Sequence, residues 1–120
     1  MRVCVAVAAL VVATSPAAYA AETIVGPTNM LCRETNAGPA EKTAAIAMWA
    51  IGYISGVNNL TPIDFLKGRD MEGIIERFRD VCLDRPDKTV LMATRDVIAR
   101  LRVETTQRLQ NSTGILPGRR

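Results

Sequence analysis

Two cysteines, Cys32 and Cys82, constrain the fold of this chain more than any other feature. The third cysteine, Cys4, lies in an N-terminal segment that we expect to be removed. An even pair of cysteines in an exported chain predicts one disulfide, and closing a loop of about 50 residues contributes about 4 kcal/mol. Two free thiols or half of a metal site are the alternatives, but the chain has no histidine to complete a zinc site.

The first residues have the pattern of a secretory signal peptide. Arg2 supplies a positive charge, residues 3–14 are almost entirely apolar, and small residues precede a cleavage point after Ala20. A membrane anchor is the alternative, but about 12 apolar residues fall short of the roughly 20 that span a bilayer. We therefore expect a signal peptide over residues 1–20 and a periplasmic mature domain over residues 21–120, without a membrane anchor.

Composition excludes several classes of function. The chain has 120 residues, which is one domain at most, and its 15 Lys and Arg nearly balance its 12 Asp and Glu. This small, scattered charge and the few aromatic residues argue against nucleic-acid binding. Ser55 and Ser112 lie in no nucleophile motif, and no phosphate-binding loop or metal-ligand motif is present. We therefore expect a non-enzymatic protein without cofactor or metal.

Helical periodicity and helix-breaking residues divide the mature chain into elements. No segment alternates as a strand would, so we predict an all-α domain, a small bundle of about four helices stapled by one disulfide. The predicted order is a loose leader (21–31), a short element from Cys32 to about Asn36, a helix from Pro39 to about Asn59, a short helix over 61–68 capped by Thr61, a helix from Asp70 to about Cys82, a helix from about Pro86 to Gln110, and a frayed tail (110–120).

Apolar residues at three- and four-residue spacing predict the buried face of each long helix. The faces are Ile46, Trp49, Ala50, Tyr53 and Val57; then Met71, Ile74, Ile75, Phe78, Val81 and Cys82; then Val90, Ala93, Val97, Ile98 and Leu101. On the last helix, Asp96, Arg100, Glu104 and Arg108 follow one another four residues apart, which predicts ion pairs along a solvated side.

The segment from Trp49 to Asn59 carries the candidate binding residues. Gly52 and Gly56 lower helix propensity but leave a shallow groove where another backbone can approach closely. In the structural interpretation, the aromatic residues belong to the core. In the functional one, an apolar surface receives a partner peptide or helix. The candidate partner-binding residues are Trp49, Tyr53, Ile54, Val57, Ile74 and Phe78.

The arrangement of these motifs resembles the HdeA-like superfamily. The shared features are a signal peptide, an early cysteine, the sequence Gly52-Tyr-Ile-Ser-Gly56-Val after Trp49, an amphipathic helix ending in Cys82, and a closing helix after Pro86. Two branches are similar: the acid-stress chaperones HdeA and HdeB, and the Tai-type immunity proteins of type VI secretion. The resemblance covers about residues 32–101.

The resemblance implies a helical periplasmic protein that binds other proteins. In the chaperone branch the partners are unfolded clients, bound when acid exposes apolar helix faces. In the immunity branch the partner is one cognate toxin, neutralised at neutral pH. A structural accessory protein remains a third alternative, and a homodimer is compatible with each of them.

Overall fold

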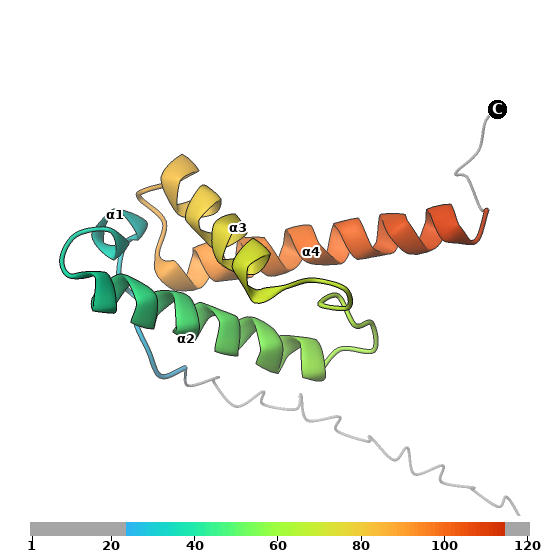
Figure 1. Ribbon diagram of the computed structural model, residues 1–120, viewed down its shortest axis with the longest axis horizontal. Coiled ribbons are helices and arrows are strands. Elements are labelled where there is room, and N and C mark those ends of the chain that lie inside the picture. Colours follow the sequence, from blue (N-terminus) through green and yellow to red (C-terminus); the bar gives the residue numbers. More distant parts are fainter. Residues whose placement is uncertain (1–23, 115–120) are drawn as a thin grey trace, which may run out of the picture.

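The computed structural model describes residues 24–114, and in this span it is all-helical (Figure 1). The helices are α1 (Cys32–Thr35), α2 (Ala40–Asn59), α3 (Met71–Asp84) and α4 (Val90–Ser112). The described residues contain no strand, only an isolated antiparallel bridge between Leu31 and Thr89. α2 and α4 run in the same general direction, α3 lies across α4, and the last turns of α4 extend beyond the rest (Figure 1). The predicted all-α, four-helix class is confirmed.

Side-chain caps fix the starts of the two later helices. The Asp70 carboxylate accepts a hydrogen bond from the Gly73 amide at 2.8 Å, and α3 begins at the next residue, Met71. Thr89 Oγ1 accepts one from the Met92 amide at 3.3 Å, so α4 begins a few residues after the predicted Pro86. Pro39 has an extended ψ of 151° and precedes α2 rather than forming its first turn.

The short helix predicted over residues 61–68 is wrong, because this segment is a loop. Asn58 Oδ1 accepts hydrogen bonds from the amides of Phe65 at 2.9 Å and Leu66 at 3.3 Å. Thr61 donates its hydroxyl to the Asn58 carbonyl at 3.0 Å instead of capping a helix. Side-chain oxygens thus compete for the backbone groups that a helix would pair. We call residues 60–70 the α2–α3 loop.

One apolar cluster holds the helices together. The α4 face is buried as predicted, and so are four of the six residues predicted for α3. Met71 is exposed because it lies at the very start of α3. The cluster consists of Cys32, Ile46, Ala50, Ile54, Phe65, Ile74, Phe78, Val81, Cys82, Val90, Ala93, Val97, Ile98 and Leu101. Phe65 belongs to the α2–α3 loop, so the loop is part of the core.

The described part of the predicted loose leader is held in place. The Met30 carbonyl accepts a hydrogen bond from the Val90 amide at 2.7 Å, and the Cys32 amide donates one to the Lys88 carbonyl at 2.8 Å. The prediction of a loose segment is therefore wrong for residues 24–31, which we call the leader strap. At the other end, α4 continues to Ser112, so the predicted fraying at residue 110 is also wrong. The predicted signal peptide and residues 115–120 lie outside the described residues.

Gly52 and Gly56 do not pack helices together within this chain. Both are exposed on α2, and a methyl group added at either glycine would meet no atom within 4 Å. The prediction that they admit a neighbouring backbone is therefore wrong for contacts inside the described chain. The reason is that α2 turns its other side, with Ile46, Ala50 and Ile54, toward the core. No helix in the described span is long and apolar enough to cross a membrane.

Candidate functional site

The structure divides the predicted partner-binding residues between the core and its edge. Ile54 of α2 and Ile74 and Phe78 of α3 are buried in the apolar cluster. Trp49, Tyr53 and Val57 are partly buried and pack against it. The six are therefore close to one apolar cluster, and two of them, Ile54 and Ile74, also line a shallow open pocket between α2 and α3. Their role in partner binding stays a prediction that requires the helices to separate.

Trp49 holds the leader strap against α2. Its indole Nε1–H donates a hydrogen bond to the Val25 carbonyl at 2.8 Å, and its ring stacks on Tyr53 with centroids 5.6 Å apart. Gly26 passes so close that a β-carbon there would lie 1.9 Å from Nε1. The backbone of Gly26 also has φ +146°, which side chains rarely adopt. Glycine is therefore required at this position for both reasons.

Replacing Gly26 with alanine is expected to displace the leader strap from Trp49. The added methyl group overlaps the indole ring, so we expect a loss of about 2 kcal/mol in the free energy of unfolding. Tryptophan emission and chemical denaturation measure the two effects. Gly38→Ala is the matched control, because Gly38 has φ +115° but only the Lys42 Cδ nearby, at 3.6 Å. Equal effects in both variants would contradict the contact with Trp49.

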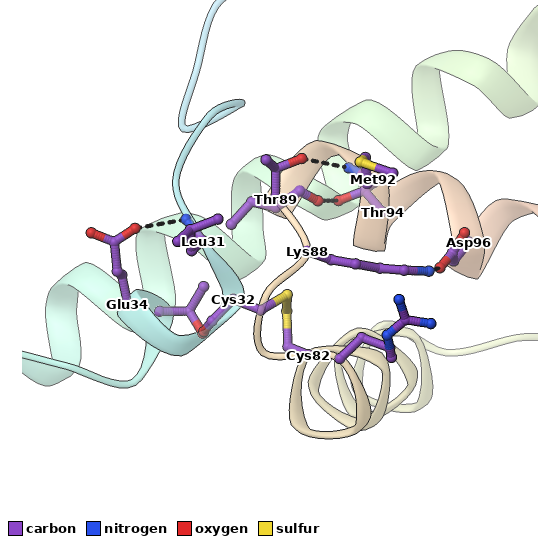
Figure 2. Close-up of a disulfide and its surroundings, with 12 residues drawn as sticks. Leu31, Cys32, Glu34, Cys82, Lys88, Thr89, Met92, Thr94 and Asp96 are labelled. Carbon is purple, nitrogen blue, oxygen red and sulfur yellow. Dashed lines mark hydrogen bonds and ion pairs between the residues drawn. A yellow bond between two sulfur atoms is a disulfide. The ribbon is translucent and has the colours of Figure 1, made fainter.

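The predicted disulfide joins Cys32 of α1 to Cys82 near the end of α3, with Cα atoms 4.9 Å apart (Figure 2). Both cysteines are buried. The strap next to Cys32 also pairs with the residues before α4. The Cys32 amide donates a hydrogen bond to the Lys88 carbonyl, and Leu31 forms an antiparallel bridge with Thr89. The bridge therefore ties the leader strap, α1 and α3 together at one end of the fold, as the sequence predicted.

The ion pairs of α4 differ from the predicted ones. Lys88, which precedes the helix, pairs with Asp96 (Figure 2). Glu104 pairs with Arg77 of α3 and Arg69 of the α2–α3 loop. The prediction of pairs four residues apart along a solvated side is therefore wrong for these two carboxylates. Both turn toward neighbouring segments, where cations from other elements reach them.

Glu104 is the centre of a charged cluster that the sequence pattern missed. Its Oε1 lies 2.6 Å from Arg77 Nη1, and its Oε2 lies 3.0 Å from Arg69 Nη1. Burial alone would raise the pKa of Glu104, but the hydrogen bonds and charges of Arg77 and Arg69 outweigh it. The pKa of Glu104 therefore lies below its ordinary value of 4.5. Arg69 and Arg77 are 27 or more residues away from Glu104 in sequence. The spacing of charged residues along one helix therefore cannot predict the cluster.

An open groove of about 670 Å³ lies between the α2–α3 loop and the last turns of α4. Pro62 and Ile63 form one side of it and Leu109 the other, with Lys67 and Arg108 among the lining residues. Ile63 and Leu109 are about half exposed. This surface is accessible in the folded chain, and sequence analysis missed it because it placed a helix over residues 61–68.

The described residues offer no site for a metal. They hold no group of three or more His, Cys, Asp or Glu that could bind one. What the arrangement provides is a closed apolar cluster, a covalent tie at one end and a carboxylate that joins three segments at the other.

The chain matches the model of a known protein family. The model of the HdeA/HdeB family matches residues 3–92, more than half of the chain. The match ends near the start of α4, so Glu104 and the groove residue Leu109 lie beyond it. The comparison with curated proteins and the comparison with solved structures give no match.

Proposed function

The chain belongs to the HdeA/HdeB family, and on that premise we propose that it is an acid-stress chaperone that exposes apolar helix faces at low pH. Proteins of this family are periplasmic chaperones that bind protein clients, and they are not enzymes. The proposal extends this activity to the present chain and assigns client binding to its own apolar residues.

The observation that carries the proposal is the position of the candidate binding residues. Ile54, Ile74 and Phe78 are covered at neutral pH, so they can meet a client only after the helices move apart. The chain has no histidine, which leaves carboxylates as the groups that respond to acid. Ion pairs made by Asp96 and Glu104 hold α4 to its neighbours. A closed apolar core held in part by carboxylates is what an acid-opened chaperone needs.

Charge supplies the driving force for opening. Near pH 2 the 12 carboxylates are protonated while the basic side chains stay charged. Without the signal peptide, the net charge then rises from about +2 to about +14, and self-repulsion opposes the compact state. The Cys32–Cys82 bridge still joins α1 to α3, which limits how far the chain expands. Trp49, Val57 and Phe78 then become accessible to unfolded clients.

Acidification from pH 7 to pH 2 is expected to shift the emission of Trp49 and to increase the binding of an apolar dye. Trp49 is the only tryptophan, so its emission reports on the contact with Val25 and Tyr53 alone. Both signals are measured on the full mature chain with its disulfide intact. A flat response across this range would remove the chaperone role.

Inhibition of a single toxin is the second candidate function, and one observation favours it. The groove lined by Ile63 and Leu109 is open in the folded chain, so it can receive a folded partner at neutral pH. A pull-down from periplasmic extract separates the two candidates. A chaperone captures many unfolded proteins at low pH, whereas an inhibitor captures one stoichiometric partner at pH 7.

A further inference from the structure

Glu104 pairs with two arginines and connects three segments of the fold. It projects from α4, while Arg77 comes from α3 and Arg69 from the α2–α3 loop. Arg69 extends the connection, because its Nε donates a hydrogen bond to the Phe65 carbonyl at 3.0 Å. One carboxylate thus ties the last third of α4 to both neighbouring segments.

Arg69 makes this connection sensitive to the charge of Glu104. The Arg69 side chain is only 11% exposed, and Arg69 Nη2 is buried without a hydrogen-bond partner. Arg69 is the buried partner of a partly exposed ion pair, so neutralising Glu104 leaves a poorly hydrated guanidinium without its counter-ion. Once Glu104 is neutral, the guanidinium groups of Arg69 and Arg77 converge on a site that no longer holds an anion. The attraction that draws Glu104 of α4 toward both guanidinium groups is then lost, which favours separation of α4 from the loop.

The side chains beneath this cluster are fully covered and apolar. Phe65 of the loop is 1% exposed, and Leu101, three residues before Glu104 on α4, is 0% exposed. Arg102 lies over the Phe65 ring, with its guanidinium carbon 5.7 Å from the ring centroid. Separation of α4 from the loop would therefore uncover the apolar surface of Phe65 and Leu101 before the core around the disulfide opens.

The other charges near Glu104 do not replace it. Asp70 borders the same pocket as Arg69 and Arg77, but its carboxylate caps α3 by binding the Gly73 amide. Arg100 and Arg108, one turn away on α4, add further positive charge. The loop adds Lys67, also positive, and Asp64, whose carboxylate accepts hydrogen bonds from Asn58 Nδ2 and the Leu66 amide. α2 carries charges only in its first turn, at Glu41 and Lys42, far along the helix from the α2–α3 loop.

We propose that Glu104 is an acid-released latch: its protonation frees the last third of α4 from the α2–α3 loop and uncovers Phe65 and Leu101 as the first surface that binds unfolded chains. The client role in this proposal rests on the proposed chaperone function, whereas the latch itself does not. Glu104 lies beyond the residues that the family model matches, whereas Arg69 and Arg77 lie within them.

The direction of the pH dependence follows from the two arginines. They lower the pKa of Glu104 in the folded chain, so its stabilising contribution is fully present above pH 4.5, the ordinary value. It is lost as the pH falls below this value and through the folded pKa. The latch therefore holds at neutral pH and opens only in strong acid.

Glu104→Gln is expected to open the latch without acid, because glutamine keeps the size of the side chain and removes its charge. At pH 6 the amide hydrogens of residues 98–112 should exchange about tenfold faster than in the wild-type chain, the effect of losing a charge-assisted contact that is partly exposed. Asp96→Asn is the matched control, since it neutralises the other paired carboxylate of α4 near the disulfide end. Unchanged exchange over residues 98–112 in Glu104→Gln, or the same acceleration there in Asp96→Asn, would overturn the latch.

The client surface is tested with a permanently unfolded probe, fluorescently labelled carboxymethylated lactalbumin. If the latch covers the first binding surface, Glu104→Gln should bind the probe already at pH 6, whereas the wild-type chain and Asp96→Asn should bind it only in acid. Faster exchange without a shift in binding would disprove the Phe65–Leu101 surface. Absence of probe binding by the wild-type chain at any pH would instead disprove the chaperone function, while the exchange measurement still decides the latch.

Discussion

Replacing both Cys32 and Cys82 with alanine is expected to lower the free energy of unfolding by about 4 kcal/mol. The bridge closes a loop of 50 residues, and without it the unfolded chain gains the conformational freedom that the bridge removes. A domain of this size has a total of roughly 5–15 kcal/mol, so the variant should be close to unfolding. Chemical denaturation of the mature chain at pH 7 measures the loss.

Alanine is the appropriate replacement because both cysteines are buried, where a serine hydroxyl would need a hydrogen-bond partner. Reduction of the wild-type chain provides the control, since it breaks the same bond without changing the core. The two should show similar losses. A midpoint of unfolding that is unaffected by either treatment would show that hydrogen bonds such as Cys32 to Lys88 hold this end of the fold without the bridge.

Phe65→Ala is expected to cost about 4 kcal/mol, the second large effect. The ring is fully buried in the apolar cluster with Arg102 of α4 over it, so its removal leaves a cavity that the short loop cannot fill. The loss should also weaken the attachment of the loop, because Arg69 and Asn58 hold the backbone of Phe65. Thermal or chemical unfolding gives the magnitude.

Leu60→Ala in the same loop is the control for Phe65→Ala. Leu60 is 87% exposed, so its truncation should change stability by less than about 0.5 kcal/mol. The comparison separates burial from hydrophobicity, since both residues are large and apolar and lie five positions apart. Comparable losses in the two variants would mean that the loop does not pack on α4 as described.

The candidate site was only partly accessible to sequence analysis. The apolar residues around Trp49 and Phe78 could be grouped because helical spacing places them on defined faces. The position of Trp49 under the leader strap could not be predicted, since residues 24–30 show no period. Glu104 was interpreted as part of a solvated face because its partners come from other elements, and sequence spacing reports only on neighbours along one helix.

The amino-acid sequence by itself determined the all-α class, the inward faces of α3 and α4, and the pairing of Cys32 with Cys82. These are properties of local periodicity and of a cysteine pair in a chain that the sequence predicts to be exported, so they need no knowledge of neighbouring segments. Only the tertiary structure decided that Phe65 is buried while Leu60 is exposed, and that Glu104 of α4 pairs with arginines of α3 and the α2–α3 loop. The physical reason is that the burial of one side chain, and the counter-ion of one charge, depend on which distant segment lies against it.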